Sequence, residues 1–365
     1  MTQLATIILT VVVWIISFVG PSGWSESIHL PEKINIAICV SAFIIMLRQR
    51  NEGNVISGKL AGAIILTLII IPFIISGKWE GASYCVALLI VYIFSHCRIT
   101  TTTIRLSAII IAGLGLVVLF IYSNGSILSG WNDNAISMVG LFSFIYFSTY
   151  LIEIKNSRSF WIWNIVTILY LQLLYHTDCR SGMLFSTLAV ICILYSGFTK
   201  RKLRNPKIRL LLLNIPLVVA IITLIISYGP HFNELNNWSI RNFDKEVFNS
   251  REILWNDSWE SLIKSCFLGT GKFEINYHNS GVAALTVFGI LGYVCWIKYF
   301  SNSMNAMSRY LKDNIVFGCM LAFTLIFLQQ SVDLGFISKN PNFLPYMILG
   351  TGIGRMRTLY QKSRI

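Results

Sequence analysis

LSAIIIAGLGLVVLFIY, residues 106–122, is an apolar stretch without a single charged side chain. About 20 apolar residues in a helix cross the hydrocarbon core of a bilayer. A helix also satisfies its own backbone hydrogen bonds there, which an isolated extended segment cannot do. The stretch therefore predicts a membrane-spanning helix.

The rest of the chain has the same character. Of its 365 residues, 55% are hydrophobic and 12% are charged, and the mean hydropathy is +0.66. Soluble globular domains carry about 25% charged residues. These figures exclude a soluble domain, a disordered chain and a small disulfide scaffold. We expect an all-α polytopic integral membrane protein that forms one transmembrane domain over residues 1–365.

Other apolar stretches predict about twelve transmembrane helices in all. The expected ranges are 4–20, 34–47, 60–76, 81–96, 106–122, 135–152, 160–175, 182–199, 210–228, 281–297, 314–331 and 342–354. The first stretch has no basic segment before it, so we expect a retained helix and not a cleaved signal peptide.

The net charge of +13 would suggest a nucleic-acid partner in a soluble protein, but here its distribution explains it. If alternate loops face the cytoplasm, beginning with the N-terminus, these loops hold most of the Lys and Arg, including the run Lys200–Arg209. The short outer loops hold almost none, as the positive-inside rule requires. We therefore expect both termini in the cytoplasm and no nucleic-acid partner.

We expect residues 229–280 to form a large loop on the outer side, too long for a simple connector. Within it, Trp255, Trp259 and Leu262 recur at helical spacing. Asn249 and Glu252 have the spacing of a capping box for that helix. The amphipathic helix either lies in the membrane interface or packs as a lid on the bundle, and the two alternatives do not exclude each other.

By these boundaries the central parts of the apolar stretches carry no Asp, Glu, Lys or Arg, which argues against an ion-coupled transporter. Topology instead collects Arg180, Arg251, His278 and Asp333 on the outer face. Two arginines suit a pyrophosphate, and a histidine can act as general base toward a hydroxyl. Each residue alone also has a structural explanation, such as headgroup binding for an arginine or pairing with Lys339 for Asp333. Together they suggest glycosyl transfer from a lipid pyrophosphate, with no metal site.

The end of the large loop carries a recognisable motif. His278-Asn279, nine further residues and Gly289-Ile290-Leu291-Gly292 resemble the H-N-x9-G-x-x-G pattern of the bacterial O-antigen polymerase and O-antigen ligase family. Cys179-Arg180-Ser181-Gly182 is similar to the family's S-R-G/S element, with Cys where Ser is common. Whether Cys179 also pairs with Cys266 stays open.

Two further segments contribute to the resemblance. Residues 250–255 followed by 268–271 resemble the family's stretch upstream of the histidine, and Asp333 matches an acidic position after the eleventh helix. The resemblance covers about residues 175–335, and the N-terminal half matches only in its helix pattern.

The resemblance implies a metal-independent, inverting glycosyltransferase of the bacterial inner membrane that needs no cofactor. Its donor would be an undecaprenyl-pyrophosphate-linked oligosaccharide at the periplasmic face. Arg180 and Arg251 would bind the pyrophosphate, and His278 would orient or deprotonate the acceptor hydroxyl. Asn279 and Asp333 would support them.

Two acceptors stay open, both in lipopolysaccharide or related polysaccharide biosynthesis. A polymerase extends another lipid-linked repeat unit, whereas a ligase transfers the glycan to lipid A–core. The loop is short for a ligase and residues 251–255 look more like surface-polysaccharide polymerases, which favours a polymerase. Membrane lipids and a chain-length regulator would be further partners. A lipid-glycan transporter and a purely structural membrane protein are the remaining alternatives.

Overall fold

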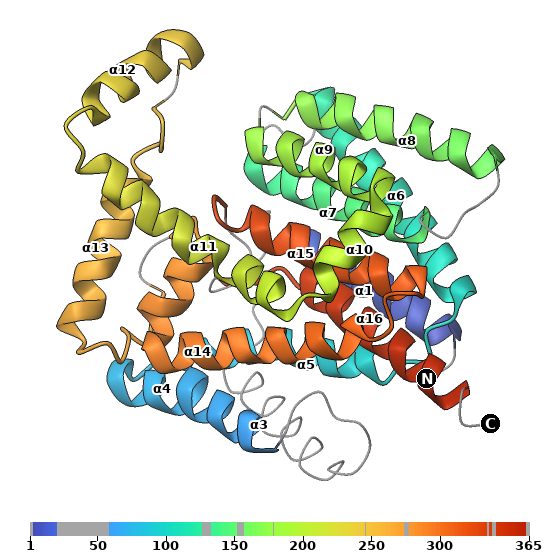
Figure 1. Cartoon of the computed structure of the whole chain (residues 1–365), viewed down its shortest axis with the longest axis horizontal. Coiled ribbons are helices and arrows are strands. Elements are labelled where there is room, and N and C mark those ends of the chain that lie inside the picture. The colour runs from blue at the N-terminus through green and yellow to red at the C-terminus, as the bar shows by residue number, and fades with distance from the viewer. Residues whose placement is uncertain are drawn as a thin grey trace.

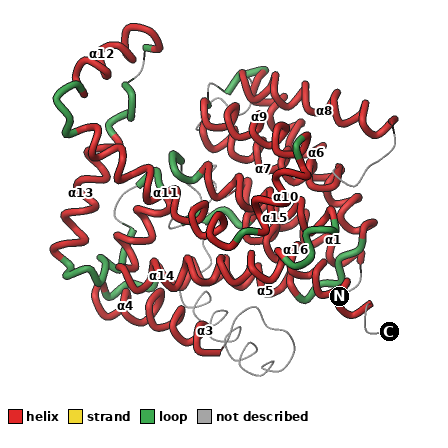
Figure 2. Tube along the Cα trace, in the orientation of Figure 1, coloured by secondary structure: helices red, strands yellow, loops and turns green. Residues whose placement is uncertain are grey.

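The computed structural model describes residues 3–19, 58–125, 133–151, 157–177, 179–244, 246–273, 277–333, 336–337 and 341–362. Within these ranges every regular element is a helix (Figures 1 and 2). The expectation of an all-α chain is confirmed for this part of the molecule.

The predicted apolar stretches correspond to helices wherever the structure describes them, and 34–47 lies outside the described residues. The elements are α1 (Gln3–Val19), α3 (Gly58–Ile65), the π-helix η3 (Leu66–Ile70), α4 (Ile71–Ser76), α5 (Glu80–Ser95), α6 (Thr101–Ser123), α7 (Asp133–Leu151), α8 (Ser157–Tyr175), α9 (Arg180–Leu194), α10 (Ser196–Arg204), α11 (Pro206–Ser227), α12 (Phe232–Phe243), α13 (Arg251–Lys264), α14 (Ser280–Ser308), α15 (Asn314–Gln329) and α16 (Leu344–Lys362).

Four helical segments of the described chain are long and apolar enough to cross a membrane: Lys59–Ser76, Thr101–Ser123, Pro206–Ser227 and Ser280–Ser308. The bent pair α9 and α10 adds a fifth if it counts as one span. Shorter apolar helices, α1, α5, α7, α8 and α15, accompany them. Large apolar side chains on the outside, such as Ile168 and Ile225, are 63% and 67% exposed. Such an apolar exterior suits a lipid environment.

The predicted helix over 182–199 is wrong at its C-terminal end. α9 stops at Leu194, Tyr195 leaves the helical conformation with ψ 38°, and α10 departs at 96°. The sequence after the bend is rich in Lys and Arg, and these charges are costly in hydrocarbon. The helix therefore turns where its apolar residues end.

The centre of the molecule is an aromatic core between α14, α15 and α16. Phe300 of α14 contacts the rings of Trp296, Phe323, Phe327, Phe336 and Tyr346 at centroid distances between 5.2 and 6.3 Å. Of the apolar window in α14, 72% is buried inside the protein. This core gives the ends of α14 and α15 a fixed relative position.

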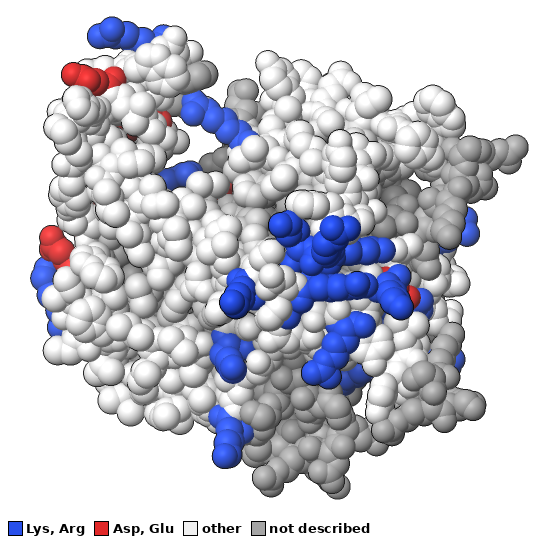
Figure 3. Space-filling model, viewed as in Figure 1, with Lys and Arg blue, Asp and Glu red and all other residues white. Residues whose placement is uncertain are grey.

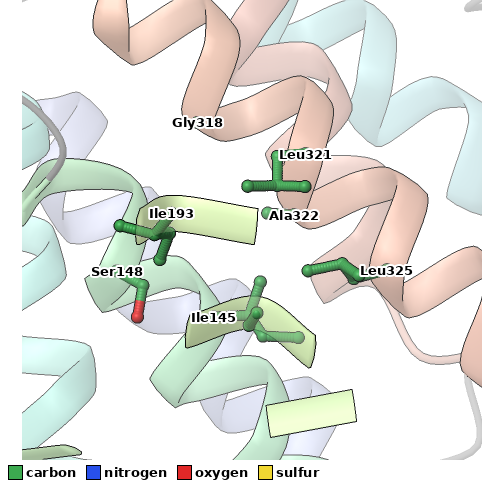
Figure 4. Close-up of a pocket in the computed structure, with 8 residues that line it drawn as sticks. Ile145, Ser148, Ile193, Gly318, Leu321, Ala322 and Leu325 are labelled. Atoms are coloured by element: carbon green, nitrogen blue, oxygen red, sulfur yellow. The ribbon is translucent and has the colours of Figure 1, made fainter. Parts of the chain in front are cut away.

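A small cavity of about 10 Å³ lies between α7, α9 and α15 (Figure 4). Its lining includes Ile145, Ile193 and Leu325, and Ser148 brings its one side-chain hydroxyl. This volume holds about one water molecule. None of the predicted site residues lines this cavity.

α14 is broken in its first half at Gly289, where φ is 68° and ψ is −176° (Figure 1). The loop 267–271 fills the break with its own backbone. It makes three hydrogen bonds there, Thr270 N to Thr286 O (2.8 Å), Gly271 N to Val287 O (3.0 Å) and Ile290 N to Phe267 O (3.1 Å). A break in an apolar helix is tolerated when neighbouring groups satisfy the freed backbone in this way.

Gly289→Ala should strongly destabilise the protein. An added Cβ would lie 2.5 Å from the Leu268 carbonyl, and the positive φ is unfavourable for any residue with a side chain. We expect a loss of about 3 kcal/mol or more, measured as a lower Tm in detergent. Gly113→Ala is the matched control, because nothing lies within 4 Å of its added Cβ. Equal melting temperatures for both variants would contradict the described break.

The large loop contains two helices, α12 and α13, at one edge of the molecule (Figure 1). The helix expected around Trp255 is present as α13, and α12 was not predicted. α13 packs against α11 and α14. Trp255 and Leu262 are buried, whereas Trp259 is 47% exposed.

The predicted cap of α13 is wrong. Ser250, and not Asn249, precedes the helix, and its side chain makes no capping hydrogen bond. Both residues have positive φ, 50° for Asn249 and 58° for Ser250, and the Ser250 hydroxyl donates to Glu246 (2.9 Å). This left-handed turn points the Ser250 hydroxyl back along the chain and places Arg251 at the start of α13.

Candidate active site

Four segments that are remote in the sequence meet near the start of α14. The Ser181 hydroxyl at the start of α9 donates to Asp333, which follows α15 (3.3 Å). Burial lowers the pKa of Arg251, whereas Asp333 and Cys179 raise it. Burial is the larger of two causes that lower the pKa of His278, and the positive charge of Arg251 is the smaller one. Hydrogen bonds also join these segments, from the Trp255 indole to the Tyr277 carbonyl (2.6 Å) and from Asn279 Nδ2 to the Ser331 carbonyl (2.9 Å), so the residues lie in one cluster.

Arg180 stands beside this cluster as the first residue of α9, and its side chain is exposed. Its neighbour Cys179 is buried, with Sγ 3.3 Å from the Ser181 Oγ. Cys179 and Cys266 are both free thiols, so no disulfide joins them. The contact between the two residues that flank Arg180 therefore holds this turn at the start of α9.

His278 has an unusual backbone conformation, with φ 49°. Its Nδ1 is buried and finds no hydrogen-bond partner among the described residues. Buried polar atoms are normally paired, so this nitrogen is available to a ligand. Because its pKa is lowered, the imidazole is neutral at pH 7 and can accept a proton.

Both neighbours of His278 are fixed in place. The Tyr277 carbonyl accepts a hydrogen bond from the indole of buried Trp255 (2.6 Å). On the other side, Asn279 is fully buried. Its side chain caps α14, where Oδ1 accepts from the amides of Gly281 (2.8 Å) and Val282 (3.0 Å). The histidine thus lies in a turn that is held at both ends.

Asn279 also joins three helices. Its Nδ2 donates to the carbonyls of Pro216 in α11 (2.7 Å) and Ser331 after α15 (2.9 Å). All the polar capacity of the amide is therefore used inside the protein. The structure gives Asn279 a structural part, anchoring the His278 turn.

Asn279→Ala should lower the free energy of unfolding by about 2–4 kcal/mol, because α14 loses its N-terminal cap and two buried carbonyls lose their hydrogen-bond donor. The effect can be read as a fall in Tm in detergent. Asn242→Ala is the control, because its side chain makes one exposed hydrogen bond to Trp238 (2.8 Å), and we expect it to change stability by less than about 0.5 kcal/mol. A wild-type Tm for Asn279→Ala would rule out the anchoring role.

Asp333 is held by an amide that the sequence analysis did not single out. Gln329 Nε2 donates to the Asp333 carboxylate (2.9 Å) and lies 3.4 Å from Ser181 Oγ. The next residue, Gln330, accepts hydrogen bonds from Ser280 N (3.0 Å) and Phe336 N (2.8 Å). Lys339, the other expected partner of Asp333, lies outside the described residues. Gln329 and Gln330 are adjacent amides at the end of an apolar stretch, and this pattern in the sequence could have identified them as part of the site.

A second buried atom without a partner lies next to Arg251. Glu252 Oε2 finds no hydrogen-bond partner among the described residues. The sequence analysis considered Glu252 only as part of a capping box. Glu252 Oε2, His278 Nδ1 and Ser331 Oγ are buried polar atoms without a hydrogen-bond partner among the described residues of these segments.

Removing the positive charge at position 251 should raise the pKa of His278. The guanidinium disfavours the protonated imidazole, so Arg251→Gln shifts the pKa upward, toward its ordinary value near 6.5. An NMR titration of labelled histidine in detergent micelles measures this. Arg241→Gln, on α12, should leave the titration unchanged. Identical titrations in Arg251→Gln and wild type would show that the two residues are not close.

Within the described ranges, no group of three or more His, Cys, Asp and Glu side chains is placed to hold a metal ion. Comparison of the chain with protein-family models, curated proteins and solved structures gives no match.

Proposed function

We propose that this chain is a membrane glycosyltransferase, a surface-polysaccharide polymerase that joins repeat units carried on undecaprenyl pyrophosphate. In this proposal the chain crosses the bacterial inner membrane about twelve times, with both termini in the cytoplasm and α12 and α13 on the periplasmic side. The observation that supports it best is the cluster of Arg251, His278 and Asp333 beside the segment that carries Arg180.

The two arginines supply what a pyrophosphate needs. A guanidinium binds phosphate oxygens with two parallel hydrogen bonds. Arg251 is half-buried, so its charge is partly withdrawn from water. A charge in such a position acts more strongly on an anion than one in bulk water. Exposed Arg180 would reach the diphosphate from the edge of the cluster.

His278 supplies the base. The acceptor hydroxyl gives its proton to the neutral imidazole, and its oxygen forms a bond to the anomeric carbon of the donor sugar. The bond from that carbon to the pyrophosphate oxygen breaks, and the lipid pyrophosphate leaves with the electron pair. Attack from the side opposite the leaving group inverts the anomeric configuration. Asp333, held by Gln329 and Ser181, is a nearby negative charge that favours the charged form of Arg251.

The identity of the acceptor separates the two candidate enzymes. The resemblance of residues 251–255 to polymerases and the short outer loop favour a second lipid-linked repeat unit as acceptor. The ligase alternative would transfer the finished glycan to lipid A–core. A chain-length regulator is a further partner of the polymerase.

Deletion of the gene and analysis of the lipid-linked glycans tests the proposal. A polymerase deletion should leave single repeats, or bare core, on gels of the surface glycan. Long polymer on undecaprenyl pyrophosphate with none on lipid A–core would identify a ligase instead. Accumulation on the cytoplasmic leaflet would identify a transporter. Unaltered glycans would refute a role in this chemistry.

A further inference from the structure

We propose that α10 and the start of α11 form a binding surface for anionic phospholipid headgroups. The exposed cations of this surface, called here the α10 basic surface, are Arg201, Lys202, Arg204 and Lys207. The inference does not depend on the proposed function, because it concerns the segment after the α9 bend and not the cluster around His278.

The surface is strongly positive and has no compensating acid nearby in the chain. Residues 196–209 contain no Asp or Glu. Exposed Arg309 and Lys312 follow α14, close to where Lys200 donates to Asn314 (2.7 Å). Figure 3 shows Lys and Arg side chains gathered over the part of the face where α10 lies. The nearby Asp313 is already paired with Arg355 (2.8 Å).

α10 is held rigidly against the bundle, so its charges have fixed positions. Leu203 is buried beneath it. The guanidinium of buried Arg209 donates to the carbonyls of Leu203 and Arg204 (both 2.7 Å) and to the side chain of Asn305 in α14. These bonds satisfy the free carbonyls at the end of α10. A charged surface that is already ordered loses little entropy when it binds.

Apolar side chains beside the cations indicate a membrane and not a soluble polyanion. Leu194, Tyr195 and Phe198 surround the 96° bend and are 60%, 67% and 59% exposed. The ammonium of Lys202 lies 5.1 Å from the centre of the Phe198 ring. Aromatic and basic residues occur together at the level of lipid headgroups, where a helix with both lies in the interface.

The test compares two pairs of substitutions in the purified full chain, in a detergent with an uncharged headgroup. Native mass spectrometry measures the binding of added phosphatidylglycerol and of phosphatidylcholine. Arg201→Gln with Arg204→Gln should weaken phosphatidylglycerol binding about fivefold for each cation removed, and should leave phosphatidylcholine binding unchanged. Arg241→Gln with Lys264→Gln removes the same charge from α12 and α13, and should change neither.

Three results would overturn the proposal. Phosphatidylglycerol binding in the α10 variant could equal that of wild type. The α12 and α13 control could lose as much binding as the α10 variant. Heparin could bind the α10 basic surface without competition from phosphatidylglycerol, which would assign the surface to a soluble polyanion.

Discussion

His278→Ala should lower the rate of glycosyl transfer by about 10²–10⁴-fold, the usual contribution of a general base. The substitution removes the one imidazole of the cluster. Its effect on stability should be small, because Nδ1 has no hydrogen-bond partner among the described residues to leave unpaired. The rate is measured with a lipid-pyrophosphate glycan donor and purified protein, alongside the Tm of the same preparation.

Two control variants distinguish a loss of the catalytic base from a change in the backbone conformation of this turn. His278→Asn keeps a residue that tolerates the positive φ of 49°, so it should preserve the fold but not the activity. His231→Ala removes an exposed histidine, with its side chain 84% exposed, that pairs with Glu234, and it should behave as wild type. Normal polymer length in cells that contain only His278→Ala would exclude the histidine as the base.

The helices could be predicted because a long run of apolar residues is enough to identify a helix that can cross a membrane. The places where prediction failed are those where tertiary contacts decide. The loop 267–271 stabilises the break at Gly289, although the sequence there continues as an apolar run. The turn before α13 uses positive φ at Asn249 and Ser250, which no side-chain spacing reveals.

The cluster could be predicted in part, because sidedness alone brings outer-face residues together. Arg251, His278 and Asp333 do meet, and they come from separate ends of helices. Distance between segments cannot be read from spacing, so the sequence analysis missed Gln329, whose amide holds Asp333. It expected Asn279 to support the histidine, and the structure shows that this side chain anchors the turn through its hydrogen bonds.

Arg251→Gln should lower the rate of transfer by about 10²–10³-fold, as the loss of one well-placed group that stabilises the transition state does. Arg251 is half-buried at the start of α13, so its position is largely fixed before the donor binds. The charge therefore needs little rearrangement when negative charge develops on the leaving pyrophosphate. Measurement of the rate at several donor concentrations shows whether the substitution changes kcat or KM. A fall in kcat indicates binding to the developing charge, whereas a rise in KM alone indicates binding to the ground state.

Arg251→Lys tests how the charge acts. Lysine keeps the positive charge but cannot make the paired hydrogen bonds of a guanidinium, so its rate should lie between those of Arg251→Gln and wild type. Lys264→Gln is the matched control at the other end of the same helix, because Lys264 is exposed and pairs only weakly with Glu260 (3.4 Å). If Arg251→Gln retained the full rate while Lys264→Gln lost it, the anion would lie at the wrong end of α13 for His278 to act on the same substrate. A graded loss at position 251 with none at 264 would place the pyrophosphate beside the histidine, where one acceptor hydroxyl can reach both the sugar and the base.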